Sequence, residues 1–227
     1  MSVIEARPYR AQDREAVRQI CADTGFLGEP IDPVFEDREL FADYLTGYYL
    51  RYEPESTLVC EVDGQVVGYL MGCRRPLAYQ AHQAVNNIVL ALRALVRCYV
   101  RGYGPASRAF LRWIALNAWR EIPAAPRAMP HFHINLRPPA RDVRATRRMM
   151  ELFLDSVHRS GHMRVCGQMV SFEERRTDAL FERYGFQVLH RSEISKYRDV
   201  YPGRVYICTV VKDLSTGPGI ARRRESA

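Results

Sequence analysis

The spacing of apolar and polar residues divides the first third of the chain into short elements. Val17, Ile20 and Cys21 recur at the three- and four-residue spacing of one buried helix face. Further on, Asp63-Gly64 separates two runs rich in strand-forming residues, which is a strong signal for a β-hairpin. The pattern predicts, in order, a strand, two helices and two strands: residues 4–10, 14–24, 38–50, 57–62 and 65–73.

The middle of the chain, residues 82–122, has a helical and strongly apolar pattern. Its first half carries an apolar stripe, with arginines on a different side. The stripe consists of Val85, Ile88, Val89, Leu92, Leu95, Val96 and Tyr99. A turn follows, and Pro105 suits the first position of a second helix, which carries Phe110, Trp113 and Ile114 on one side. This pattern predicts a helical hairpin inserted between two strands.

The last part of the chain returns to alternating strands and helices after a proline-rich linker. Its clearest helix has a regular inward face made of Met149, Met150, Phe153, Leu154 and Val157. The predicted elements are a strand, a helix, a strand, a helix and two strands: residues 131–136, 143–160, 163–170, 172–184, 185–191 and 204–211. The polar tail, residues 215–227, is predicted to be disordered.

Charge and cysteine content narrow the class of protein. With 47% hydrophobic residues, the 227-residue chain can build a sizeable core in one domain. The net charge of +7 belongs to the middle segment, because nine arginines between Arg74 and Arg127 face a single acid, Glu121. The six cysteines form no CxxC pair, so neither a metal site nor a disulfide framework is expected. With no signal-peptide pattern and no apolar span of membrane length, we expect a cytoplasmic protein.

Four stretches of the sequence resemble the GNAT superfamily of acyl-CoA-dependent N-acetyltransferases. The stretches are IEARPYRAQDREAVRQICADTGF, STLVCEVDGQVVGYLMGC, HFHINLRPPARDVRATRRMMELFLDSVHRSG and RTDALFERYGFQVLHRSE. They resemble, in order, the family's first strand and helix, its central hairpin, its cofactor-binding strand, loop and helix, and its closing helix and strand. The resemblance implies an α/β fold with a mixed, mostly antiparallel central sheet flanked by helices. Residues 1–214 would form this single domain, with a helical insertion at about 77–130.

The resemblance also implies a binding site for acetyl-CoA or another acyl-CoA, and no metal. The family loop reads Gln/Arg-x-x-Gly-x-Gly/Ala and opens a helix whose backbone N–H groups hold the pyrophosphate. Here Arg141 fills the first position, but Arg144 and Thr146 occupy the glycine positions, and Asp142 stands where glycine is also frequent. The implied cofactor-binding residues are Leu136, Arg137, Arg141, Asp142, Val143, Arg144, Ala145, Thr146 and Arg147. The alternative is that these side chains close the loop and the domain no longer binds CoA.

Three polar residues of the cofactor-binding strand are candidates for catalysis. His131, His133 and Asn135 alternate and therefore share one face of that strand. An imidazole suits deprotonation of an ammonium group near neutral pH, and His133 is the better candidate because it lies nearer the end where the family's strands splay apart. Glu61 is a second candidate base. The competing interpretation is that the histidines are hydrogen-bonded structural residues and that Glu61 is solvated.

The family's general acid has no direct counterpart in this sequence. Many members place a tyrosine four residues before the glycine of their Gly-Phe pair, and Phe181 occupies that position here. Tyr184 is three residues further along the same helix and could protonate the thiolate in its place. Alternatively, Tyr184 packs as an ordinary aromatic residue and water supplies the proton.

The resemblance implies an N-acyltransferase in which an amine attacks the thioester directly and a backbone N–H near Leu136 polarises its carbonyl. A small-molecule or lipid-like amine is the expected acceptor. For residues 82–122, the alternatives are a lid on the sheet, a homodimer interface and a peripheral membrane contact. The lack of a nucleic-acid-binding motif argues against a nucleic-acid partner. Two rival functions are a non-catalytic domain with this fold and a membrane-peripheral protein that works through the helical hairpin.

Overall fold

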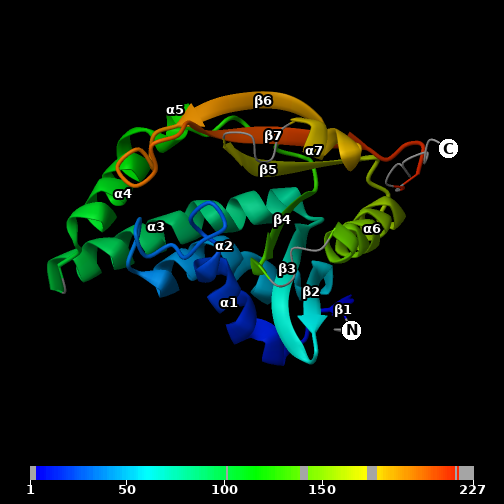
Figure 1. Cartoon of the computed structure of the whole chain (residues 1–227), viewed down its shortest axis with the longest axis horizontal. Helices are drawn as coiled ribbons and strands as arrows, with labels where there is room; N and C mark the ends of the chain where they lie inside the picture. The colour runs from blue at the N-terminus through cyan, green and yellow to red at the C-terminus, as the bar shows by residue number, and fades with distance from the viewer. Residues whose placement is uncertain (1–3, 101, 139–142, 173–177, 218, 220–227) are drawn as a thin grey trace.

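The computed structural model describes the chain except residues 1–3, 101, 139–142, 173–177, 218 and 220–227 (Figure 1). Seven strands form one sheet in the order β1-β2-β3-β4-β5-β7-β6. The strands are β1 Ile4–Pro8, β2 Thr57–Val62, β3 Gln65–Cys73, β4 His131–Leu136, β5 Arg164–Phe172, β6 Gln187–Ile194 and β7 Val205–Asp213. The α-helices are α1 Arg14–Asp23, α2 Arg38–Tyr52, α3 Pro76–Val100, α4 Pro105–Leu116, α5 Ala118–Glu121, α6 Val143–Arg159 and α7 Asp178–Arg183, and short 3-10 helices span Ala11–Asp13 and Pro54–Ser56. This mixed α/β architecture confirms the predicted fold class.

The sheet opens at its one parallel pair. All other neighbouring strands pair in antiparallel fashion, whereas β4 and β5 run parallel and pair at only two positions, His131 with Cys166 and Phe132 with Gly167. Beyond Phe132, β4 continues along β3 while β5 continues along β7. Figure 1 shows the result as two groups of strands, β1 to β4 and β5 to β7, that diverge from this point.

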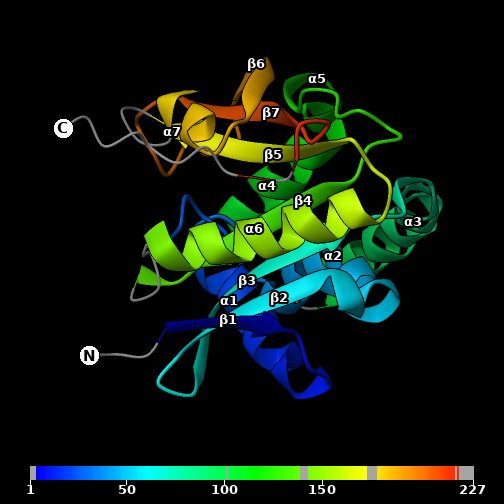
Figure 2. The ribbon, with the colours of Figure 1, turned by 90° about the vertical axis from the view of Figure 1, so that its right-hand side faces the viewer.

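Local sequence accounts for the elements that were predicted best. The turn between β2 and β3 has positive φ at both central residues, 49° at Asp63 and 81° at Gly64, the backbone that an Asp-Gly hairpin adopts. All five predicted inward residues of α6, from Met149 to Val157, are at most 3% exposed. Figure 2 shows α6 crossing the molecule between the two groups of strands. Its apolar face packs against residues of both, including Leu70, Phe132 and Val210. Helices α1 and α2 cover the opposite face of β3, around Tyr49 and Tyr69.

Some predicted boundaries were wrong near the end of the chain. Of the helix expected at 172–184, α7 covers Asp178–Arg183, whereas Phe172 belongs to β5 along β7 and residues 173–177 lie outside the described residues. The strands β6 and β7 begin one or two residues later than expected and end two or three residues later. Most of the tail predicted to be disordered, residues 215–227, lies outside the described residues.

The middle segment forms helices as predicted, and the arginine side of its first helix packs against α2. The first helix begins at Pro76 rather than at residue 82, and Figure 1 shows α4 turning away from α3 at an angle. The arginine side of α3 faces α2, where Arg93 binds Asp43 at 2.7 Å and Arg97 binds Asp37. These two arginines are therefore held by ion pairs within the protein. Acidic residues of α2 and its N-cap attract this side of α3 inward, so the apolar stripe faces outward.

Close packing of β3 against α6 gives a first testable prediction. A Cβ atom added at Gly72 would lie 2.1 Å from the ring of Phe153, whose exposed fraction is only 2%. We expect Gly72→Ala to lower the free energy of unfolding by about 1–3 kcal/mol, because the buried ring cannot move aside. The matched control is Gly47→Ala in α2, where nothing lies within 4 Å and a helical alanine should stabilise instead. Urea unfolding of both variants measures this, and equal stabilities would contradict the packing argument.

Candidate functional site

Beyond Phe132, β4 no longer pairs with β5 on that side of the strand. The N–H of Arg137 donates to the Val67 carbonyl of β3 at 2.9 Å, and the Pro130 carbonyl accepts from the Cys166 N–H of β5 at 2.9 Å. Backbone groups alternate in direction along a strand, so the odd-numbered residues of β4 bond to β3 and the even-numbered ones face β5. Since β5 has diverged beyond Phe132, the N–H of Ile134 is directed to the side that β5 has left.

His131 lies at the closed end of the gap within an aromatic cluster. Its Nε2 is 3.0 Å from the Tyr49 hydroxyl, its ring lies 4.6 Å from that of Tyr79, and it hydrogen-bonds to the Met129 backbone carbonyl. Burial, with a smaller contribution from His133, lowers the pKa of His131 to about 4. The imidazole is therefore neutral at pH 7. With hydrogen bonds to both Tyr49 and Met129, His131 acts as a positioning residue for the cluster.

His133 is placed differently from His131. It stands on the part of β4 that no longer pairs with β5, on the same strand face as His131, with its ring 5.7 Å from Tyr49 in an edge-on arrangement. Within the described part of the chain, no hydrogen bond to its ring is found, and the residue is partly exposed. Burial lowers its pKa to about 4. His133 therefore presents a neutral imidazole to whatever enters the site.

Asn135 is held in place by its cross-strand neighbour on β3. Its Nδ2 donates to the Tyr69 hydroxyl at 2.9 Å, and that hydroxyl also hydrogen-bonds to the Cys21 thiol of α1. Both supporting side chains are essentially inaccessible to solvent, Tyr69 at 1% and Cys21 at 0%. This anchoring leaves the Asn135 amide oxygen directed away from Tyr69 and available to a ligand.

Ion pairs fix the open end of the same strand and rule out one candidate base. Arg137 donates to Asp23 at the end of α1, with its Nη2 2.5 Å from the carboxylate, and Arg38 pairs with the same acid. The Arg137 side chain therefore secures β4 to the helical face. Glu61 accepts from Arg7 at 2.6 Å on the pair β1–β2, near the sheet edge opposite β6. There it is part of an edge ion pair and is separated from the histidines by β3.

The residues expected to hold the pyrophosphate lie at the start of α6, and the structure describes only some of them. Arg141 and Asp142 lie outside the described residues, as does the side chain of Val143. The Ala145 side chain is buried in the core, so only its backbone could face a ligand. Arg147 is bound to Glu151 at 2.9 Å along the helix. The remaining two, Arg144 and Thr146, are exposed and partly exposed on the first turn.

Tyr184 and Phe181 occupy the other face of the sheet. Phe181 is 5% exposed and belongs to the core under α6, and Tyr184 packs against the same core. Burial raises the pKa of the Tyr184 phenol, while Arg183 and Arg147 act against this rise. Tyr184 thus lies on the cofactor-helix side, whereas the histidines face α1 and α2. A phenol with a raised pKa is a proton donor rather than a base at neutral pH.

Sequence reasoning missed the tyrosines that build this site. Tyr49 and Tyr79 come from α2 and α3, far from β4 in the sequence, and Tyr69 comes from β3. Their aromatic spacing resembles ordinary core, and only the pairing of β3 with β4 and the packing of α2 bring them to the histidines. A tyrosine-rich helix such as α2, with Tyr48 beside Tyr49, was the one available signal.

Comparison with known proteins assigns the fold. No protein-family model and no curated protein matches the chain. Among solved structures, SsHAT shares 25% identity with a TM-score of 0.58, covering 92% of this chain and 98% of its own. The polyamine N-acetyltransferase of Drosophila melanogaster catalyses the formation of N-acetylagmatine. It aligns with a TM-score of 0.54 and 16% identity, over 93% of this chain and 100% of its own. The protein yncA of Salmonella typhimurium, solved with its cofactor acetyl-CoA, aligns with a TM-score of 0.53 and 13% identity, over 96% of this chain and 98% of its own.

The chain therefore has the fold of the GNAT superfamily of N-acetyltransferases. This confirms the family resemblance noted in the sequence. Within the described residues, no helix is both long and apolar enough to cross a bilayer. The same residues contain no group of three or more histidine, cysteine or acidic side chains placed to hold a metal ion.

Proposed function

We propose that the protein is an acyl-CoA-dependent N-acyltransferase that transfers an acyl group, most simply acetyl, to a small amine. The observation that carries this proposal is the opening of β4 away from β5 after Phe132, with the Ile134 N–H directed into the gap and His133 beside it. These residues fit an acyl-CoA, because an extended chain can lie between the strands and hydrogen-bond to the strand edge. Acyl-CoA, when bound, supplies a thioester whose carbonyl carbon is the electrophile.

On the acyl side, the chain contributes hydrogen bonds and charge. The Ile134 N–H would donate to the thioester carbonyl and stabilise negative charge on its oxygen. The N-terminal turn of α6, with Arg144 exposed on it, would hold the phosphates, because backbone N–H groups and the helix dipole both favour an anion there. Tyr184, or water, would donate the proton that the departing thiolate requires.

On the amine side, His133 would act on a neutral substrate. A base with a pKa near 4 cannot efficiently deprotonate an alkylammonium, whose pKa is about 10. It can accept a hydrogen bond from the neutral amine and orient its lone pair. Once nitrogen bonds to the acyl carbon, that nitrogen becomes far more acidic, and His133 or a water held by Asn135 takes its proton as the amide forms. The C–N bond replaces the C–S bond, and no covalent enzyme intermediate is needed.

The walls of the site favour a small monoamine. The histidine face is bordered by Tyr49 and Tyr79, and the acid that acts electrostatically on His131, Glu53, is already bound by Arg75 and the Arg74 N–H. A second positive charge on the substrate would therefore find little compensation. Polyamine acetylation is known for one protein of this fold and forms the alternative. We also propose a cytoplasmic location, where the six free cysteines would remain reduced.

Calorimetry with acetyl-CoA and a long-chain acyl-CoA tests the proposal on the full-length protein. We expect saturable binding of at least one thioester and, by mass spectrometry, acylation of amines in a panel that includes monoamines and spermidine. Arg144→Ala should weaken thioester binding, whereas Arg159→Ala, at the far end of α6 and 72% exposed on its side chain, should not. Failure of every thioester to bind would favour the rival interpretation, a non-catalytic domain with this fold.

The lowered pKa of His133 predicts the pH dependence of the reaction. A histidine with a pKa near 4 stays neutral from about pH 5 to 8, so its ionisation should leave no inflection in that range. The amine substrate loses its proton as the pH rises, and kcat/KM should therefore increase tenfold per pH unit until the amine's own pKa is reached. The measurement is kcat/KM across this range with one amine. An inflection near 6.5 that disappears in His133→Asn would contradict this assignment.

A further inference from the structure

Helix α3 exposes an apolar face that the protein itself does not cover. On its buried side, Leu90 and Ala94 belong to one core cluster with Leu40 of α2 and with Phe110 and Trp113 of α4. On the opposite side, seven large apolar residues have exposed fractions between 48% and 93%. These residues are Val85, Ile88, Val89, Leu92, Leu95, Val96 and Tyr99. Contiguous apolar patches of this length are rare on monomeric soluble proteins and mark interaction sites.

The spacing of these residues is that of a helix–helix seam. Val85, Ile88, Leu92, Leu95 and Tyr99 follow one another at intervals of three, four, three and four residues. This alternation is the heptad pattern of two helices packed side by side, in which each seam residue inserts between residues of the facing helix. An interfacial membrane helix needs a broad apolar face but no such register. The seam therefore favours a second helix as its occupant.

The residues that flank the seam would allow another helix to approach. Ala84 and Ala91 lie along one flank, and Val89 and Val96 lie along the other. Small alanine side chains permit close contact, and uncharged flanks avoid the like-charge repulsion that two copies of a basic helix would otherwise suffer. The same face of a second copy of α3 could therefore pack against it.

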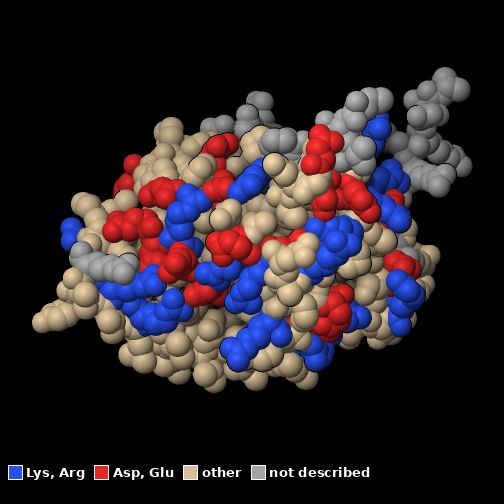
Figure 3. Space-filling view, turned by 90° about the horizontal axis from the view of Figure 1, so that it is seen from below, with Lys and Arg blue, Asp and Glu red and all other residues tan. Residues whose placement is uncertain are grey.

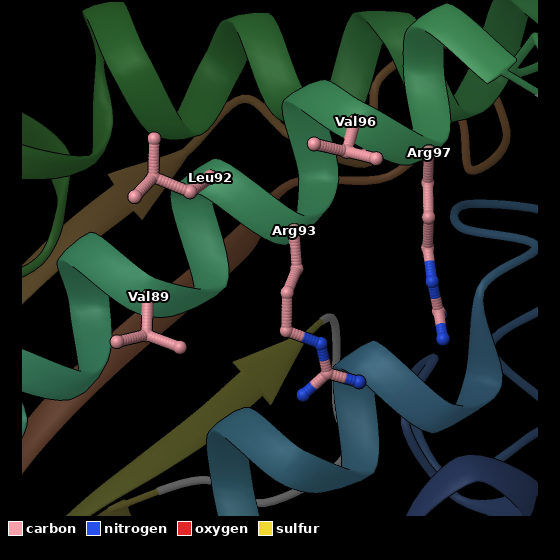
Figure 4. Close-up of a pocket in the computed structure, with 5 residues that line it drawn as sticks. All are labelled: Val89, Leu92, Arg93, Val96 and Arg97. Carbon is pink, nitrogen blue, oxygen red and sulfur yellow. The ribbon is translucent and has the colours of Figure 1, made fainter.

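The arginines of α3 are bound within the protein and do not face outward to lipid headgroups. Figure 4 shows Arg93 and Arg97 extending towards α2, away from Val89, Leu92 and Val96, with which they line a shallow groove of about 360 Å³. Both make ion pairs with α2 and its N-cap, and Arg97 also reaches Glu39 at 3.2 Å. Figure 3 shows basic and acidic residues interspersed over the face it displays rather than gathered into one basic patch.

We propose that a second copy of this chain packs its α3 along this seam to form a two-fold dimer. The seam from Val85 to Tyr99 spans about 21 Å of the 25-residue helix, and the exposed fractions of its residues show that the described part of the chain does not cover it. Pairing the same surface of two copies gives a closed, isologous interface. The inner side of α3 carries Tyr79 beside His131, so the dimer would also hold the helix that borders the catalytic site.

Sedimentation velocity over the micromolar range tests this proposal without reference to activity. We expect wild-type protein to sediment at twice the 26.2 kDa chain mass. Leu92→Glu and Leu95→Glu, each placing a charge in the seam, should both give monomers with unchanged circular dichroism. The matched control is Asn87→Glu, on the same helix but rotated about 100° from Ile88 away from the seam, which should remain dimeric.

Three outcomes would overturn the proposal. They are wild-type protein that stays monomeric throughout the range, seam variants that stay dimeric, and a control variant that dissociates like the seam variants. Co-sedimentation with phosphatidylcholine–phosphatidylglycerol vesicles tests the alternative that a membrane surface, rather than a second copy, covers the apolar face of α3. Wild-type protein that is monomeric in solution and binds these vesicles through the seam would assign the face to a membrane surface instead. Should both glutamate variants unfold, Ile88→Ser, a milder polar substitution in the seam, replaces them in the same comparison.

Discussion

Replacing His133 with alanine should lower kcat/KM for acyl transfer by about 10²-fold. The contribution of a positioned general base is of this size, and His133 is the site imidazole without a described hydrogen bond to the protein. The effect should fall mainly on kcat, because the thioester would be bound by β4 backbone and α6 rather than by this ring. Steady-state kinetics at saturating acyl-CoA measures it.

Two other histidines serve as controls for this prediction. His190→Ala, on the exposed face of the edge strand β6, should leave the rate unchanged. His131→Ala should reduce stability and rate together, because it removes the partner of the Tyr49 hydroxyl. A rate for His133→Ala equal to wild type, with intact thioester binding, would remove this residue from the mechanism and leave water held by Asn135 as the proton acceptor.

Replacing Glu53 with alanine should lower the free energy of unfolding by about 3–5 kcal/mol, a larger loss than we expect from Gly72→Ala. This carboxylate at the end of α2 is 0% exposed. It accepts hydrogen bonds from the Tyr48 hydroxyl (2.8 Å), the Cys73 thiol (3.3 Å) and the backbone N–H groups of Arg74 (2.8 Å) and Arg75 (3.3 Å). Its removal would leave several buried donors without an acceptor at the junction of α2, β3 and α3.

Glu55 provides the matched control for Glu53. It lies two residues away and also contacts Arg74 and Arg75, but its side chain is 51% exposed. Surface ion pairs of this kind contribute little, so Glu55→Ala should change stability by no more than about 0.5 kcal/mol. Urea unfolding of both variants gives the comparison. Near-equal values would show that the buried carboxylate is not the element that joins these three segments.

Local pattern was sufficient for most of the elements and for one face of the site. The Asp63-Gly64 turn, the inward face of α6 and the alternation that aligns His131, His133 and Asn135 all depend on residues close together in sequence. The spacing of apolar residues and the residue types of a turn are properties of a short stretch of sequence, so they can be recognised without the rest of the chain. The family resemblance added the order in which those elements assemble.

Only the tertiary structure decided which of these residues could act. The family resemblance favoured His133 over His131, and the structure adds that the Tyr49 hydroxyl hydrogen-bonds to His131 and not to His133, because α2 packs over one end of β4 and β5 diverges at the other. The apolar stripe of α3 predicts a buried face by itself, but the acids of α2 compete for the opposite side through Arg93 and Arg97. Burial and ion pairing both depend on partners distant in sequence, and for that reason the pattern of the chain alone could not reveal these contacts.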